Sequence, residues 1–179
     1  MESAFIRIFA LSITALMTKR ICLILCLLLA CMGLAAQNSE VRVYKGSYAL
    51  SSNQILTLQG GNVYSGRYTL SSNQILKVEG GNIYSGRYAL SSNQILKVEG
   101  GNVYSGRYAL SSNQVLKIEN GNVYSGRYAL SSNQILKVVG GNVYLGSYPL
   151  SSNQVLKIEG HVTLPEFAAI WYACTYLIP

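Results

Sequence analysis

The hydrophobic positions in the middle of the chain follow a period of two inside a longer period of twenty. Aligned on Tyr-x-Gly, six copies of one segment begin at the following residues: Tyr44, Tyr64, Tyr84, Tyr104, Tyr124 and Tyr144. A repeat of this length is typical of an array or a closed ring of identical units. The copies are so alike that recent duplication explains their sameness, so identity among them carries no functional information.

Within each copy, apolar and polar side chains alternate as in a half-buried antiparallel strand. In the third copy we expect a first strand over residues 84–90, with its Tyr, Gly, Tyr and Leu side chains facing inward. A second strand is expected over residues 94–99, with Gln94, Leu96 and Val98 inward and Ile95, Lys97 and Glu99 outward. Each copy is therefore predicted to be a hairpin with one apolar and one charged face.

The segments between these strands have the composition of turns. Gly-Gly-Asn between copies suits a tight turn with positive φ, and Ser91-Ser92-Asn93 can place its Asn in the left-handed region. Asn120 replaces the first Gly of one turn, and Asn is the residue best able to take the place of Gly at positive φ. Six hairpins supply twelve strands, and closing them into a barrel removes both open edges.

A different pattern begins after Gly160. Thr163 and Glu166 have the spacing of a capping box, and Pro165 would fall in the first helical turn. The segment that follows is apolar on all sides, which indicates a buried helix. We expect its plug residues to be Phe167, Ile170, Trp171 and Cys174. The predicted fold is all-β with one helix: an antiparallel hairpin-repeat barrel of about twelve strands around, or capped by, this C-terminal helix. The small Gly of each Tyr-x-Gly-x-Tyr would let wall and helix approach closely. The alternative is a helix on the outside of the barrel or on a membrane.

The N-terminal region reads as a targeting segment. Lys19-Arg20 precedes an apolar run over residues 21–29, and small residues follow up to Ala36. These features predict a secretory signal peptide over residues 17–36, with residues 1–16 as an overlong start and cleavage after Ala36, before Gln37, or after Ala35. Two alternatives stay open: a lipoprotein with Cys31 as the lipidated first residue, and a membrane anchor, for which the apolar run is shorter than the about 20 residues required. Either processing route predicts an exported protein, in the periplasm, at the cell surface or secreted. Residues 37–43 would then be a linker, 44–161 the six repeats and 162–179 the helix.

The composition leaves little material for catalysis. The chain has no Asp and one His, His161, which is best explained as a junction residue. Cys22, Cys26 and Cys31 belong to the targeting segment, so Cys174 alone remains and no internal disulfide is expected. We therefore predict no enzymatic activity, no metal site and no cofactor.

The charge is more informative. From Gln37 onward the chain has eleven Lys and Arg against six Glu, a net charge of +5. The cations fall at two repeated positions, both expected on the outer face: Arg67, Arg87, Arg107 and Arg127, and Lys77, Lys97, Lys117, Lys137 and Lys157. They have a structural explanation, cross-strand pairing with Glu that keeps the wall soluble. They also have a functional one, contacts with an anionic lipid or polysaccharide. An exported location disfavours nucleic acid, and the oligomeric state is not determined by the sequence.

Tandem hairpins built on Tyr-x-Gly-x-Tyr-x-Leu-Ser-Ser and followed by a hydrophobic helix resemble the bacterial β-flower domains. In overall plan these domains are similar to the tubby C-terminal domain, a barrel wrapped around a hydrophobic helix. The resemblance covers residues 44–178 and implies the same plan for this chain. The β-flower families have no established activity to carry over. Tubby-like domains bind membrane phosphoinositides, but no residue of this chain matches their lipid-binding motif.

Three classes of function are compatible with these observations. The first is a non-enzymatic exported or cell-envelope module that binds an anionic surface or ligand, with membrane association as one form of it. The second is a structural protein that self-assembles at the cell surface. The third is an outer-membrane barrel, whose strands should run about 9–11 residues, longer than the roughly six expected between Gln94 and Glu99.

Overall fold

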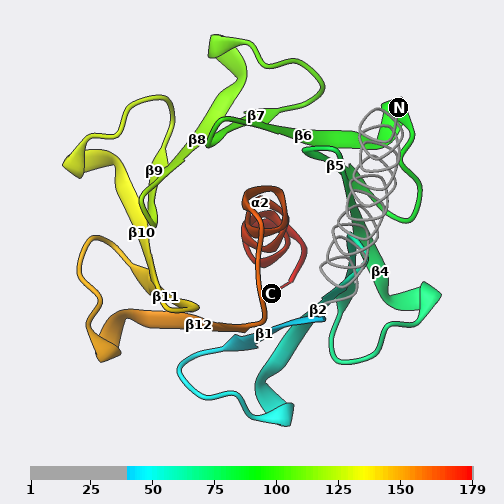
Figure 1. Cartoon of the computed structure of the whole chain (residues 1–179), viewed down its shortest axis with the longest axis horizontal. Coiled ribbons are helices and arrows are strands. Elements are labelled where there is room, and N and C mark those ends of the chain that lie inside the picture. The colour runs from blue at the N-terminus through cyan, green and yellow to red at the C-terminus, as the bar shows by residue number, and fades with distance from the viewer. Residues whose placement is uncertain (1–39, 179) are drawn as a thin grey trace, which may run out of the picture. The chain divides into compact units, whose positions relative to one another are not determined.

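The computed structural model describes residues 40–178, which form a closed barrel of antiparallel strands around one helix (Figure 1). The strands are β1 (Val41–Lys45), β2 (Gln54–Gln59), β3 (Asn62–Ser65), β4 (Gln74–Glu79), β5 (Asn82–Ser85), β6 (Gln94–Glu99), β7 (Asn102–Ser105), β8 (Gln114–Glu119), β9 (Asn122–Ser125), β10 (Gln134–Val139), β11 (Asn142–Leu145) and β12 (Gln154–Glu159). Each strand pairs with its neighbours in the chain, and β1 pairs with β12. The predicted twelve-stranded barrel with one helix is confirmed.

Tight Gly-Gly turns join the long strand of each hairpin to the short one. In the turn between β6 and β7, Gly100 and Gly101 have φ of 54° and 81°, as in the two-residue turns that match the twist of a hairpin. A Cβ on Gly101 would lie 2.5 Å from the carbonyl oxygen of Ile118, whereas a Cβ on Gly100 would meet no atom within 4 Å. Asn120, at the first position of its turn, has φ of 51°. The prediction that it takes the place of Gly at positive φ is confirmed.

The other connections are long loops that radiate outward from the ring (Figure 1). We call them petals and define them as residues 46–53, 66–73, 86–93, 106–113, 126–133 and 146–153. Each petal ends in a short 3-10 helix: η1 (Ser51–Asn53), η2 (Ser71–Asn73), η3 (Ser91–Asn93), η4 (Ser111–Asn113), η5 (Ser131–Asn133) and η6 (Ser151–Asn153).

The petals correct three expectations for the third copy. The strand predicted over residues 84–90 ends at Ser85, because Gly86 has φ of 76° and turns the chain out of the sheet. Gly86 was also expected to let the wall and the helix approach closely, but a Cβ at this position would meet no atom within 4 Å, so no close approach depends on it. Asn93 is not left-handed: it belongs to η3, and its N–H donates to the carbonyl of Leu90 at 2.9 Å.

A β-bulge at the start of each long strand changes which side chains face inward. Ile83 pairs with Leu96 and Tyr84 pairs with Gln94, so Ile95 is the extra residue. Leu96 is buried inside the barrel as predicted, and Ile95 also packs against the core. Gln94 lies on the outer face, where its amide donates to Asn82 Oδ1 at 2.9 Å. The prediction that Gln94 and Tyr84 face inward and Ile95 outward is therefore wrong, because a simple alternation of apolar and polar residues does not reveal an inserted residue.

The barrel is closed by the two ends of the repeat region. β1 begins at Val41, so residues 41–43, expected in a linker, are part of the wall. Val43 pairs with Ile158 and Tyr44 with Lys157, in the register that joins β10 to β11. The sixth hairpin is thus assembled from β12 and β1, without a connecting turn.

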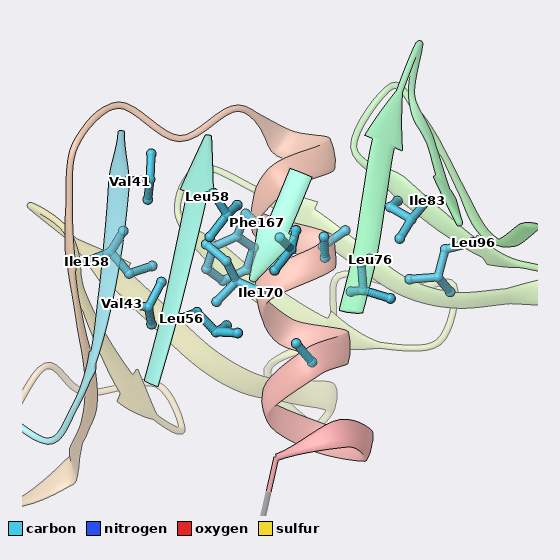
Figure 2. Packing of buried hydrophobic residues seen from close by; sticks show 14 of the residues in the cluster. Val41, Val43, Leu56, Leu58, Leu76, Ile83, Leu96, Ile158, Phe167 and Ile170 are labelled. Carbon is cyan, nitrogen blue, oxygen red and sulfur yellow. The ribbon is translucent and has the colours of Figure 1, made fainter. Parts of the chain in front are cut away.

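The C-terminal segment runs inside the barrel as α2 (Leu164–Tyr172) and continues as one π-helical turn, η7 (Ala173–Leu177). The capping box is confirmed: Thr163 accepts from the backbone of Glu166, whose carboxylate accepts from the backbone N–H of Thr163 at 2.9 Å. Pro165 lies in the first turn, as predicted. Figure 2 shows Phe167 and Ile170 among the inward side chains of the strands. Both are buried, whereas Trp171 and Cys174 are half-buried.

Candidate functional site: the petals

Two backbone hydrogen bonds recur in every petal and leave its middle exposed. In the third petal, Gly86 N–H donates to the carbonyl of Ile75 at 2.7 Å and anchors the start of the loop to the sheet. The turn of η3 closes the other end through Asn93 and Leu90. The residues between these anchors, an Arg, a Tyr and an Ala, make no ladder hydrogen bonds and project from the barrel.

An arginine lies over the tyrosine that follows it in four consecutive petals. The guanidinium carbons of Arg67, Arg87, Arg107 and Arg127 are 5.3, 5.7, 5.8 and 5.6 Å from the ring centroids of Tyr68, Tyr88, Tyr108 and Tyr128. These distances are within the range of cation–π attraction. The contact orders the arginine on the petal while leaving its charge in solvent.

Every petal also exposes a tyrosine and a leucine, which the alternation pattern had placed inside the barrel. The exposed residues are Tyr48, Leu50, Tyr68, Leu70, Tyr88, Leu90, Tyr108, Leu110, Tyr128, Leu130, Tyr148 and Leu150. The leucines are 56–59% exposed. Their predicted inward facing is wrong because the strand ends at the glycine before them. These twelve side chains, on six loops, form a repeated and largely exposed surface.

The two petals beside the barrel closure lack the arginine. Ser47 and Ser147 stand in its place, and the adjoining Tyr48 and Tyr148 are each 72% exposed. Tyrosines covered by an arginine are 60–62% exposed. The cationic petals therefore form one continuous arc of four, between β3 and β10.

The predicted lysine ring lies elsewhere, on the outer wall of the barrel. Its members are half-buried and held by neighbouring side chains: Lys137 Nζ donates to Asn122 Oδ1 at 2.7 Å, and Lys97 pairs with Glu99 at 2.8 Å. The two cation rings were expected together on one face, but the structure separates them. Pairing with Glu runs along the strand rather than across strands, and the petal arginines contact tyrosine instead. This leaves the arginines as the freer of the two sets.

Other candidate chemistry is sparse in residues 40–178. No group of three His, Cys or Glu side chains in this range is placed to hold a metal ion. His161 is exposed beside the start of the helix. Burial raises the pKa of the Cys174 thiol to about 11, so it is protonated at neutral pH. The proposed signal peptide and Cys31 lie outside the described residues, and no helix within the described range is long and apolar enough to cross a bilayer.

Sequence reasoning found the petal arginines but missed the tyrosines and leucines beside them. The available signal was the glycine after each Ser, as in Gly66 and Gly86, which ends a strand when its φ is positive.

Comparison with known families agrees with this geometry. The family described as 6-fold beta flower protein matches residues 43–171, which span eleven of the strands, part of β1 and most of α2. The chain belongs to this β-flower family. A search of the curated proteins and a search of the solved structures found no match. The family membership confirms the resemblance inferred from the repeat motif and describes a repeat module; it brings no ligand with it.

Proposed function

We propose that this β-flower chain is an exported, non-enzymatic module of the cell envelope that binds anionic lipid surfaces through its petals. The observation that carries the proposal is the exposed Leu beside an Arg-covered Tyr, repeated around the barrel. Tyrosine is enriched where proteins meet the membrane interface. A basic residue near an anionic bilayer contributes about 1 kcal/mol. The exposed leucines favour lipid over polysaccharide, because sugar hydroxyls gain nothing from an aliphatic side chain.

The repeat makes this surface multivalent. The six copies repeat around a closed ring, so we expect several of their petals to contact one surface at the same time. Weak contacts at single petals then add up through effective concentration. The arc of four arginines makes one part of the ring more cationic than the rest.

The lipid contact is tested by vesicle cosedimentation of the full chain with phosphatidylglycerol and with phosphatidylcholine vesicles. Changing Arg67, Arg87, Arg107 and Arg127 to Gln should weaken binding to the anionic vesicles by about tenfold or more. The matched control changes Lys77, Lys97, Lys117 and Lys137 to Gln, which removes the same charge from the wall and should cost less than about threefold. The N-terminal region is the same in all variants, so any vesicle binding by that region is common to them and does not distinguish the Arg variant from the Lys variant.

A double variant, Leu90→Ser with Leu110→Ser, tests how much insertion of the leucines into the bilayer contributes to vesicle binding, separately from charge. This variant should lose vesicle affinity while keeping its salt dependence, since only exposed charges are screened. Equal loss in the Arg and Lys variants would overturn the petal site. Binding to a soluble acidic polysaccharide but not to vesicles would replace the lipid surface with that ligand, and growth of fibres would favour the self-assembling alternative.

Export has its own test. Cell fractionation and intact mass of the recovered protein should give a mature chain that begins at Gln37, as the small residues before it predict. A lipidated Cys31 at the N-terminus would make the protein a lipoprotein, and a cytoplasmic chain that retains Met1 would contradict export.

A further inference from the structure

The helix does not fill the barrel evenly. α2 packs most closely against β4, β5 and β6, and the strands opposite these in the closed ring are β10, β11 and β12. Leu76 and Leu96, on the near side, are fully buried or nearly so, whereas the equivalent Leu136 and Leu156 on the far side are only half-buried. A cavity of about 410 Å³ lies between the helix and these strands. This volume is within the range of small-molecule sites.

The cavity is lined almost entirely by apolar side chains. Val155 contributes from the wall, and Ile170, Trp171 and Ile178 contribute from the helical segment. Cys174, also in the lining, carries a neutral thiol. An apolar cavity offers water few hydrogen-bond partners, so an apolar ligand that enters displaces only weakly held solvent.

Lys45 is the single cationic residue in this lining, and it occupies a position at which most copies of the repeat have a different residue. Lys45 pairs with Leu156 in register, and Leu145 pairs with Leu136. In the other four copies the equivalent residue, opposite the same wall leucine, is serine: Ser65, Ser85, Ser105 and Ser125. Both departures from serine, Lys45 and Leu145, line the cavity and are exposed. They make this side of the rim apolar and cationic.

We propose that the cavity binds a single-chain amphiphile with an anionic head, a long-chain fatty acid. Its alkyl chain lies between α2 and strands β10–β12, and its carboxylate lies at Lys45. The site is separate from the petals, shares no residue with the petal arginines, and does not depend on their function.

The opposite side of the helix supplies an internal comparison. A second hollow of about 410 Å³ is lined by Ser105 together with Trp171 and two tyrosines. It has no cation and more hydrogen-bonding groups, so it does not match an alkyl carboxylate. Trp171 borders both spaces, and Lys45 borders only the first.

The test uses the full chain and the fluorescence of Trp171, its only tryptophan. Bromine quenches tryptophan at short range, so 12-bromododecanoate below its micelle concentration should quench Trp171 saturably, with one molecule per chain. Unlabelled dodecanoate should compete, and at least tenfold better than octanoate, because four fewer methylenes are buried with the shorter chain. Quenching without saturation, or equal competition by the two acids, would overturn the site.

Charge reversal identifies the head-group contact. Lys45→Glu should weaken 12-bromododecanoate by about tenfold and should strengthen 12-bromododecylamine, a gain that an unfolded variant cannot produce. Lys157→Gln, a change in the outward cation of the adjoining β12, is the matched control and should leave both affinities unchanged. The proposal fails if Lys45→Glu leaves the selectivity unchanged. It also fails if changing the four petal arginines to Gln abolishes quenching, or if only vesicles of brominated phosphatidylglycerol quench, because the ligand would then be a membrane lipid bound elsewhere.

Discussion

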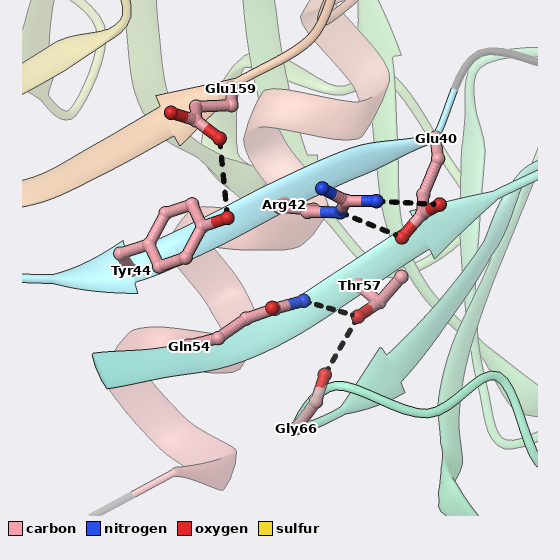
Figure 3. A network of polar contacts seen from close by, with 7 residues as sticks. All are labelled: Glu40, Arg42, Tyr44, Gln54, Thr57, Gly66 and Glu159. Atoms are coloured by element: carbon pink, nitrogen blue, oxygen red, sulfur yellow. Dashed lines mark hydrogen bonds and ion pairs between the residues drawn. The ribbon is translucent and has the colours of Figure 1, made fainter. Parts of the chain in front are cut away.

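The phenol of Tyr44 in β1 donates to the carboxylate of Glu159 in β12, with 3.2 Å between the two oxygens (Figure 3). The two residues are 115 positions apart, and they belong to the strands that close the ring. The other five hairpins are each joined by a covalent Gly-Gly or Asn-Gly turn, so this junction alone depends on noncovalent contacts between the ends of the repeat region. The backbone pairing across the same junction aligns Arg42 with Glu159, Val43 with Ile158 and Lys45 with Leu156. Other polar contacts nearby lie beside the junction rather than across it: Arg42 Nε donates to Glu40 at 3.0 Å, and Thr57 Oγ1 donates to the carbonyl of Gly66 at 2.8 Å.

We expect Tyr44→Phe to destabilise the barrel by about 1 kcal/mol, because it removes the hydrogen bond while keeping the ring. Urea unfolding, followed through Trp171 fluorescence, measures the change. Tyr124→Phe is the matched control, since Tyr124 occupies the same place in β9, within a covalently joined hairpin. Equal losses in the two variants would mean that the hydrogen bond to Glu159 contributes nothing special to closure.

The same pair predicts a dependence on alkaline pH. Burial of the Tyr44 phenol, followed by its hydrogen bond to Glu159, raises its pKa above the usual 10.0. A pKa that is higher in the folded state stabilises the fold at pH values below about 10, and this stability is lost as the pH rises through the folded value. The difference in unfolding free energy between the native chain and Tyr44→Phe should therefore be constant from neutral pH to about pH 10 and should shrink above it. A difference that grows with pH would contradict the assignment.

Much of the fold could be predicted because the same pattern of strand and turn residues occurs in all six copies. The twelve strands, the buried position of Leu96, the turn role of Asn120 and the capping box of Thr163 all follow from local patterns. Two features did not follow. The bulge at Ile95 inserts one residue, which reverses the facing of Gln94 without leaving a mark in an apolar-polar alternation. The use of residues 41–43 as the closing strand depends on a partner at the far end of the chain.

The candidate site could be predicted only in part, for a similar reason. Arg87 stands out as a charge, but Tyr88 and Leu90 are residues that normally fill a core. Their exposure depends on the positive φ of Gly86, which ends the strand. The cavity depends on how α2 packs inside the closed barrel, an outcome that no single segment encodes.

The Gly-Gly turns make a prediction that distinguishes two adjacent glycines. Gly101→Asn should destabilise the barrel by roughly 2 kcal/mol or more, because its Cβ would meet the Ile118 carbonyl oxygen 2.5 Å away in addition to the positive φ. Gly100→Asn should change the unfolding free energy by less than about 0.5 kcal/mol, since Asn120 already occupies the equivalent position at φ of 51°. Urea unfolding of both variants checks this. Similar losses at the two positions would show that φ, rather than the close approach of the neighbouring copy, controls the turn.

The helix makes the last prediction. Ile170 is fully buried in the middle of α2, packed inside the barrel, so Ile170→Ala removes a side chain whose place the surrounding strands cannot close over. We expect a loss of about 2–5 kcal/mol in unfolding free energy, the range for large-to-small changes in a core. Thr175→Ala, at an exposed position of η7, keeps the same helical segment and should stay within about 0.5 kcal/mol. Trp171, next to Ile170 in the chain, reports both transitions by fluorescence. If the two variants unfold at the same urea concentration as the native chain, the helix contributes no packing energy to the barrel, and the cavity beside it loses its structural basis.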